Sequence, residues 1–354
     1  MRRIVLPLVL ISGSALALQS GFPKRAESSA SSADPSKSRS ATTAAAVATR
    51  SPASISTDGK AMDSTSASDS VTQVSMRDVN FFVIPQAALR IRTLRGQMRA
   101  FKGGPVVFDD KNSFVIQLKY AQIGLNGDDI TTLMNKHIFA YPGAPLKKLK
   151  VRTSGSQIVQ SGFMHKIIDI PFEITANVSV TPEGLIRLHP VRSRILGVDG
   201  NSLMRAFGLT LEKILDLRKA KGVTVKGNDL FLDPTMILPP PAIEGHATAI
   251  RVEGNELVQT FGTPDAAPPL SPPDTAAPSF MFYKGGTLHF GKLLMLDAEM
   301  EIVDRRPSGF FDFDLDRYKE QLVAGYSRTL PDLGLEVYML GLDKLASAGN
   351  QPSP

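Results

Sequence analysis

The chain has 354 residues, of which 42% are hydrophobic and 21% are charged, and these values are ordinary for a globular protein. Its net charge of +6 permits contact with an anionic lipid or polymer but does not demand nucleic acid. Because the sequence has no cysteine, it excludes disulfides, a thiol nucleophile, a cysteine-ligated metal and a lipidated N-terminal cysteine.

Residues 1–18 have the layout of a secretory signal peptide. Arg2 and Arg3 precede an apolar run, Ile4–Leu18, which contains a small-x-small cleavage site. The alternative is a membrane anchor, but this run is short against the roughly 20 residues that span a bilayer. Residues 19–75 are dominated by Ser, Ala and Thr, and they cannot bury enough apolar surface to offset their ordering entropy. We therefore expect a disordered tether and an exported protein, either periplasmic or extracellular.

Residues 76–262 are expected to form one β-rich domain. Strands are predicted at Val79–Leu94 and Ser113–Gln122. Asp128 or Asp129 is the expected cap of a short helix, whose apolar residues are Ile130, Leu133, Met134, Ile138 and Phe139. Turn residues then predict four hairpins, at Leu149–Phe163, Ile167–Val191, Val225–Leu230 and Val252–Leu257. The short connections predict antiparallel pairing.

The clearest amphipathic helix is predicted at Asn201–Gly222. Its large apolar residues recur at steps of three and four, on one stripe of a 3.6-residue helix; they are Leu203, Met204, Phe207, Leu211, Ile214 and Leu215. Asn201 or Ser202 can cap the first turn, and Gly222 can take the left-handed conformation that ends a helix. The predicted fold is therefore α+β and β-rich: a curved antiparallel sheet of consecutive hairpins wrapped around this long helix, with a second short helix.

The C-terminal part begins with a segment rich in Pro and Ala, residues 263–279, which is expected to be a linker. Residues 280–345 either complete the main domain or form a separate β unit, and residues 346–354 are a polar tail. Strands are predicted at Phe280–Phe290, Lys292–Asp304 and Leu335–Leu340, with a short helix or turn region at Phe310–Tyr326. In the second strand apolar residues alternate with Asp297, Glu299 and Glu301, which predicts one buried and one solvated face.

The sequence contains no strong catalytic or metal motif. The five histidines lack the spacing to other ligands that builds a metal site. Asp312, Asp314 and Asp316 are the best calcium candidates, but they lack the central glycine and closing glutamate of an EF-hand, and a solvated strand face is the favoured interpretation. We predict no enzyme activity, no catalytic residue, no metal and no cofactor.

Two basic clusters are interleaved with apolar residues. One consists of Arg90, Arg92, Arg95, Arg99 and Lys102, and the other of Lys147, Lys148, Lys150 and Arg152. Beside an apolar groove either could hold an anionic head group, since each charge contributes about 1 kcal/mol near an anionic membrane surface. The alternative is a solvated strand face. Nucleic-acid binding is not favoured, because tryptophan and a basic-aromatic platform are both missing from the sequence.

Three passages between about residues 127 and 262 carry a family resemblance. They are YPGAPLKKLKVRTSGSQIVQSG, PFEITANVSVTPEGLIRLHP, and the predicted long helix with GVTVKGNDLFLDPTMILPPPAIEGHATAIRVEGNELVQTFG. Their order of hairpin, hairpin, helix and hairpin resembles the periplasmic lipomannan-elongation-factor family, whose fold is similar to tubular lipid-binding domains. The resemblance implies a strongly curved antiparallel sheet around a helix, with lipid tails in the cavity between them.

The leading hypothesis is an exported, non-enzymatic protein that holds or carries a lipid or other acylated envelope molecule, with an anionic membrane surface as a further partner. The apolar lining is expected from Leu203, Met204, Phe207, Leu211, Ile214 and Leu215, and the head-group site from Lys147, Lys148, Lys150 and Arg152. One alternative is a scaffolding envelope protein whose helix only fills the core. The other is a hydrolase of envelope polymer, with Asp297, Glu299, Asp312 or Asp314 as its acids.

Overall fold

The structure is a computed structural model that describes residues 71–348, apart from 166–167, 197, 201 and 203–209. The predicted signal peptide, residues 19–70 of the predicted tether and the tail from residue 349 lie outside the described residues. Strand β1 (Val71–Ile84) begins before the predicted domain boundary at residue 76. Its first residues pair on both sides, with Val71 opposite Arg99 and Gln73 opposite Lys284, so they belong to the folded domain rather than to a tether.

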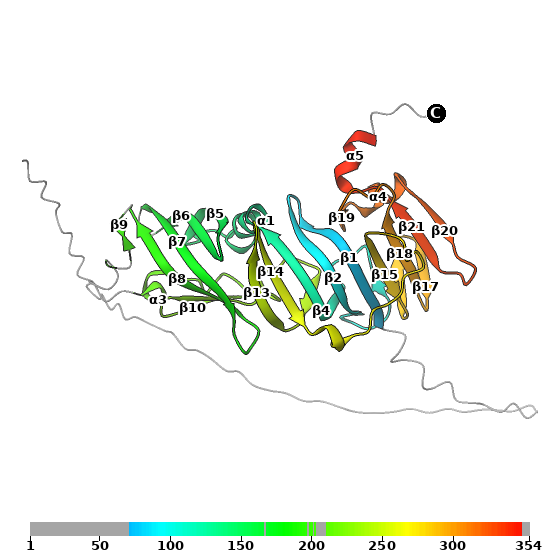
Figure 1. The fold of residues 1–354 in the computed structure, drawn as a ribbon, viewed down its shortest axis with the longest axis horizontal. Coiled ribbons are helices and arrows are strands. Elements are labelled where there is room, and N and C mark those ends of the chain that lie inside the picture. Colours follow the sequence, from blue (N-terminus) through cyan, green and yellow to red (C-terminus); the bar gives the residue numbers. More distant parts are fainter. Residues whose placement is uncertain (1–70, 166–167, 197, 201, 203–209, 349–354) are drawn as a thin grey trace, which may run out of the picture. The chain divides into compact units, whose positions relative to one another are not determined.

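An eleven-stranded, mainly antiparallel sheet is formed within residues 71–339 (Figure 1). Its strands in spatial order are β13 (Ala247–Glu253), β14 (Glu256–Gly262), β4 (Phe114–Asn126), β2 (Ala87–Ala100), β1, β15 (Phe280–Lys284), β18 (Glu299–Asp304), β21 (Leu335–Met339) and β20 (Tyr326–Thr329). Two short strands add in parallel, β12 (Ala242–Glu244) to β4 and β19 (Phe311–Asp314) to β1. The segment after residue 280 therefore completes the same sheet as β1, β2 and β4.

The inner face of this sheet carries a dense apolar core. Phe81 of β1 packs on Phe313 of β19 with ring centroids 5.6 Å apart. Phe108 contacts Tyr318 of α4 (Tyr318–Val323) edge to face. A small sheet of β17 (Leu293–Leu296), β16 (Thr287–Phe290) and β3 (Val106–Val107) adds Leu288 and Phe290 to the same cluster. The remaining helical elements of this part are η2 (Pro264–Ala266) and α5 (Leu342–Ala348).

The predicted strand at Lys292–Asp304 is wrong as a single strand. The strand is interrupted at Asp297, whose φ is +52°, and the residues on either side form β17 and β18, which belong to two different sheets. Leu294 and Leu296 of β17 are exposed, whereas Glu301 of β18 is buried. The expected solvated face of β18 is covered because the segment predicted as a linker, residues 263–279, packs Leu270 and Ala277 over it.

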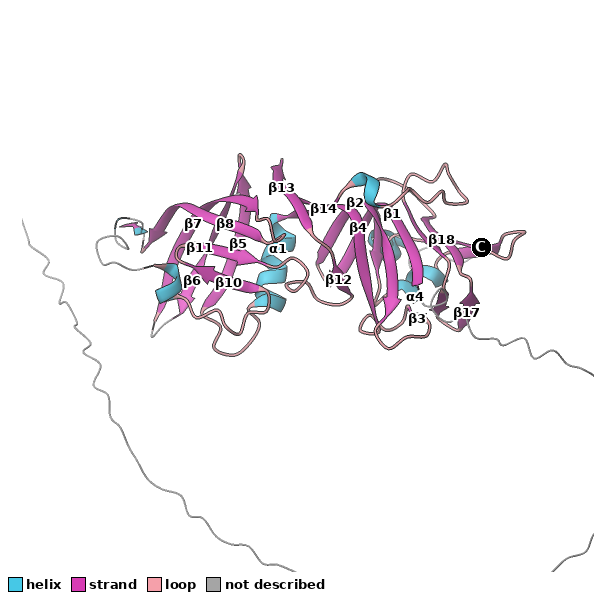
Figure 2. Ribbon diagram, turned by 90° about the horizontal axis from the view of Figure 1, so that it is seen from below, coloured by secondary structure: helices cyan, strands magenta, loops and turns pink. Residues whose placement is uncertain are grey.

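A seven-stranded antiparallel sheet lies within residues 146–232 (Figure 2). In spatial order it contains β10 (Val223–Lys226), β11 (Asp229–Leu232), β8 (Ile186–Ile195), β7 (Asp169–Val180), β6 (Gln157–His165) and β5 (Leu146–Ser154), with β9 (Val198–Asp199) paired to β8. The hairpins predicted from turn residues are therefore confirmed, since β5 pairs with β6, β7 with β8, β10 with β11 and β13 with β14.

The predicted helix at Asn201–Gly222 is wrong over its described part. Residues 201 and 203–209, which include Leu203, Met204 and Phe207, lie outside the described residues. Beyond them a single helical turn, α3 (Leu211–Ile214), ends at Leu215, whose φ of −103° and ψ of 122° are extended. At 100° per residue, a continuous helix would place Ala220 on the side opposite Leu211. In the structure both residues are buried, and Ala220 belongs to the apolar cluster that also contains Phe139 and Leu217. Tertiary burial of both residues is incompatible with one helical stripe.

A buried carboxyl group lies between the main sheet and the segment that covers it. Glu301 is 0% exposed; its Oε2 accepts the backbone N–H of Asp274 at 2.8 Å, and its Oε1 has no partner among the described residues. Burial raises the pKa of Glu301 to about 7, and the nearby carboxylates of Asp274 and Glu336 act in the same direction. The folded protein therefore keeps a proton that the unfolded chain releases near pH 4.5.

Because the folded state holds this proton and the unfolded state releases it, we predict that the free energy of unfolding falls by up to about 3 kcal/mol as the pH rises from 4.5 to about 7. Glu301→Gln keeps the site neutral and should remove most of this fall, so that the variant is more stable than the wild type at pH 8. Chemical denaturation at a series of pH values measures the effect. The control Glu299→Gln, which removes a partly exposed carboxylate paired with Lys284 at 2.9 Å, should leave the fall in place. Parallel profiles for the wild type and Glu301→Gln would contradict the assignment.

Candidate functional site

The predicted short helix is present and is formed by α1 (Gly127–Leu133) and η1 (Met134–Ile138, a π-helical turn). Its N-cap is Asn126 rather than Asp128 or Asp129. The Asn126 side chain accepts the N–H groups of Asp128 and Asp129 at 2.8 and 2.9 Å, and the Asp129 carboxylate accepts the Asn126 N–H in return. This capping box fixes where the helix begins, directly after strand β4.

The helix covers the free edge of strand β5, as both Figure 1 and Figure 2 show by placing α1 beside β5. Asn135 replaces a neighbouring strand: its Nδ2 donates to the Leu149 carbonyl at 2.7 Å, and its Oδ1 accepts the Leu149 N–H at 2.9 Å. Thr131 Oγ1 accepts the N–H of Val151 at 2.9 Å. At Gly127 a Cβ atom would lie 2.5 Å from the Val151 carbonyl oxygen, so only glycine permits this approach. The helix is thus held on the sheet edge by hydrogen bonds.

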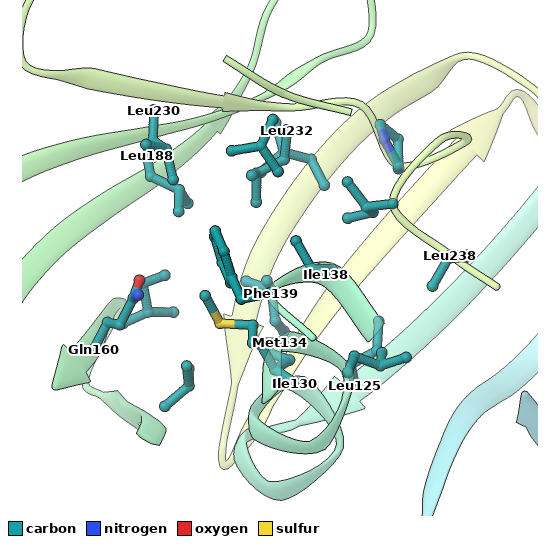
Figure 3. Close-up of a pocket in the computed structure, with 18 of the residues that line it drawn as sticks. Leu125, Ile130, Met134, Ile138, Phe139, Gln160, Leu188, Leu230, Leu232 and Leu238 are labelled. Carbon is teal, nitrogen blue, oxygen red and sulfur yellow. The ribbon is translucent and has the colours of Figure 1, made fainter. Parts of the chain in front are cut away.

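Between this helix and the inner face of the seven-stranded sheet lies an apolar cavity of about 90 Å³, here called the first chamber. Its wall is built from α1 and η1, from inward-facing residues of β5, β6, β8, β10 and β11, and from β4 and β14 of the larger sheet. Figure 3 shows Met134 and Phe139 on one side of this space, with Leu188 and Leu232 on the other. The lining is Leu, Ile, Val, Met, Phe and Pro, with Gln160 and Gln259 as its polar members.

A second chamber of about 50 Å³ continues along the same sheet. The two chambers share five wall residues, which are Leu146, Ile158, Gln160, Leu188 and Leu230. Met164, Phe172 and Ala176 extend the wall along β6 and β7, and Leu211 and Leu215 close it from the other side. Two of the predicted lining residues therefore line the cavity, whereas Ile214 lies on an outward groove with Tyr141 and Asp216.

The predicted head-group residues lie on the outer face of the same sheet. In β5 the buried residues Leu146, Leu149 and Val151 alternate with Lys147, Lys150 and Arg152. Lys147 Nζ is 3.7 Å from Asp169, and Arg152 is 4.0 Å from Glu173. Lys148 Nζ lies 5.6 Å from the ring centroid of Phe163. The structure therefore groups the four basic residues together but separates them from the cavity by the thickness of the sheet.

Other charges of this outer face are also paired across strands. Asp229 of β11 accepts hydrogen bonds from Arg187 and His189 of β8, at 2.8 and 2.6 Å. Burial acts to raise the pKa of Asp229, but these two hydrogen bonds outweigh it and hold the pKa below its usual range. The pairs join β8 to β11 on the side opposite Leu188 and Leu230, so they support the cavity wall from behind.

The first basic cluster is largely neutralised by acids from distant parts of the chain. Arg90 pairs with Glu256 at 2.6 Å, Arg92 pairs with Glu253 and Glu256, and Arg99 pairs with Glu244 at 2.6 Å. Arg95 donates to the carbonyl oxygens of Pro264 and Ala267, each at 3.1 Å. This cluster therefore joins β2 to β12, β14 and the segment after β14.

The candidate acids do not line either chamber within the described part of the chain. Asp312 accepts a hydrogen bond from Asn80 at 2.7 Å, and Asp316 pairs with Lys111 at 2.5 Å. Asp314 is buried and accepts the Asp316 N–H at 2.9 Å, so the three aspartates do not share one solvated face. Among the described residues, no group of three or more His, Asp or Glu side chains is arranged to hold a metal ion.

The sequence assigned the cavity lining to the segment 201–222, whereas the helix that lines the first chamber is α1–η1. The apolar residues of α1 and η1 were recognisable from their spacing, and Ile130, Leu133, Met134, Ile138 and Phe139 all line the first chamber. The two glutamines carried a weaker signal: each interrupts an apolar strand at a position that faces inward. Comparisons with protein-family models, curated proteins and solved structures gave no match. Over the described residues, no helix is long and apolar enough to cross a bilayer.

The role of Asn135 predicts a large stability effect from one polar residue. Asn135→Ala leaves the N–H and carbonyl of Leu149 without their partners, and we expect it to lower the free energy of unfolding by about 1–3 kcal/mol. The neighbouring exposed change Lys136→Ala should stay within about 0.5 kcal/mol of the wild type. Chemical denaturation tests both, and hydrogen exchange at the Leu149 amide should accelerate only in Asn135→Ala. Equal stabilities for the two variants would show that the helix is not held through Asn135.

Proposed function

We propose that this chain is an exported, non-enzymatic protein that holds the hydrocarbon chain of a lipid or other acylated envelope molecule. The observation that carries the proposal is the pair of adjacent apolar chambers along the inner face of the seven-stranded sheet, the first of which is covered by the α1–η1 helix. Burial of apolar surface would supply the binding free energy, at roughly 25 cal/mol for each Å² removed from water.

The chemistry of the chamber walls favours a hydrocarbon ligand. No charged side chain is among the residues that line them, so water and ionic ligands would gain little by entering. The chambers have volumes of about 90 and 50 Å³ and share five wall residues, so an extended chain could occupy both. Met134 adds an unbranched, adaptable side chain to the wall, which helps it follow chains of different shape.

Two sequence features support the cellular part of the proposal. Residues 1–18 have the layout of a signal peptide, which would deliver the protein to the periplasm or the cell exterior. The resemblance to the lipomannan-elongation-factor family implies a sheet that covers a helix with lipid tails between them. In this chain α1–η1 would take the place of that helix, and the outer basic residues Lys147, Lys150 and Arg152 would contact an anionic membrane surface rather than a head group inside the cavity.

The two alternatives receive less support. A scaffolding role predicts a fully packed interior, whereas the seven-stranded sheet leaves two chambers. A hydrolase predicts acids that converge in a cleft, whereas Asp297 lies at the turn between β17 and β18, Glu299 pairs with Lys284, Asp312 accepts a hydrogen bond from Asn80 and Asp314 accepts one from the Asp316 N–H.

The proposal predicts that protein purified from its exported form carries acylated lipid. Organic extraction followed by mass spectrometry should recover acyl chains in up to one equivalent per chain, and native mass spectrometry should show the corresponding mass increase. Recovery of a clean apoprotein that also takes up no lipid from vesicles would overturn the proposal.

A filling variant tests whether the cavity is the site. Ala176 is 4% exposed and lines the second chamber, so Ala176→Phe places a ring inside it. We expect its affinity for a fatty-acid probe to fall by tenfold or more, which corresponds to about 1.4 kcal/mol. The matched control is Thr175→Phe, which adds the same ring to the outer face of the same strand and should bind as the wild type does. Unchanged binding by a folded Ala176→Phe would place the ligand elsewhere.

A further inference from the structure

Two glutamine side chains interrupt the otherwise apolar wall of the first chamber. Gln160 extends from β6, and Figure 3 shows it directed toward the cavity from the strand that also carries Ile158. Gln259 extends from β14, where it faces the same way as Leu257, and it is only 7% exposed. The two side chains therefore reach the same space from different sheets.

Neither carboxamide is satisfied by the protein. Among the residues that the structure describes, no hydrogen bond joins either side-chain amide to another group. Neither amide is fully buried, but an amide that faces an apolar cavity without a protein partner is less favourable there than leucine, which fills a similar volume without an unpaired polar group. Gln122 of β4 is different, because it lies on the opposite face of its strand and lines neither chamber.

The position of Gln160 indicates where along a bound molecule its partner would lie. Gln160 lines both chambers, and it is the polar member of the five residues that they share. A carboxamide can donate two hydrogen bonds and accept two. A ligand that occupies both chambers would therefore place a hydrogen-bonding group at their junction, with hydrocarbon on either side of it.

We propose that the ligand is an acyl compound whose ester or amide linkage lies at the junction of the chambers, hydrogen-bonded to Gln160, with hydrocarbon arms in both chambers and Gln259 as the further polar contact on the first-chamber side. This inference rests on the proposed function and adds the chemical class of the ligand. It separates acyl esters and amides from pure hydrocarbons such as long isoprenoid chains, which offer no acceptor at that point. The alternative is that a buried water molecule, and not a ligand, forms hydrogen bonds with the two amides.

The test compares two probes of similar length, octyl nonanoate, whose ester has hydrocarbon on both sides, and octadecane, each delivered from cyclodextrin. The chain has no tryptophan, so Phe139→Trp, which lies in the first chamber, provides a single fluorescent reporter in the full-length protein. The ratio of the two affinities is measured in this background and again with Gln160→Leu and Gln259→Leu added. Each probe leaves water at the same cost for both proteins, so the change in the ratio isolates the contact with the amides.

We expect the double substitution to reduce the preference for octyl nonanoate over octadecane by about five- to tenfold, as the loss of one or two hydrogen bonds implies. The melting temperature of the ligand-free variant should rise, because two unpaired amides are removed from an apolar wall, and this rise shows that the variant is folded. Gln122→Leu, the same substitution outside the cavity, should leave the affinity ratio unchanged.

The outcomes separate this inference from the proposed function. If the reporter protein binds both probes and the double substitution leaves their ratio unchanged, the amides serve only a buried water molecule and the inference is overturned while lipid binding stands. If the reporter protein, and the wild type in a competition assay, bind neither probe, the proposed function itself fails.

Discussion

The cover of strand β5 is the constraint on which the rest of the site depends. The seven-stranded sheet ends at β5 with unpaired backbone groups and with an apolar inner face, and both must be kept from water. The α1–η1 helix meets the first need through Asn135 and Thr131, which bond to the backbone of β5. It meets the second only in part, because the apolar side chains of the helix and of the sheet do not fill the space between them. That space is the first chamber.

The two large sheets differ in how completely they are packed, and the difference assigns them different tasks. The eleven-stranded sheet has a continuous core in which Val74, Met281 and Phe313 are fully buried. Its strands β4 and β14 also contribute Leu125 and Leu257 to the first chamber. A dense sheet therefore supplies one rigid wall, while the opposite wall is a single layer of strands backed by surface ion pairs such as Arg187 with Asp229.

The local elements could be predicted from the sequence, whereas their partners could not. Turn residues such as Gly155-Ser156 and the Gly227-Asn228 pair located the hairpins, and apolar spacing located α1–η1. The segment after residue 210 was misassigned because its stripe fits a helix, yet Glu212 and Leu211 are held by the β10–β11 turn, through the Gly227 carbonyl and the Asn228 side chain. The pairing of Arg90 with Glu256 could not be predicted from local sequence either, since the two residues are 166 positions apart. Long-range contacts decided each of these cases.

The central claim is that hydrocarbon lies between the seven-stranded sheet and the α1–η1 helix. A crystal structure with a brominated fatty acid tests it most directly, because the anomalous signal of bromine locates the chain without reference to the protein. The account predicts bromine inside the chambers, between Phe139 and Leu188 and along Gln160. Bromine found only on the protein surface, with both chambers unchanged, would contradict it.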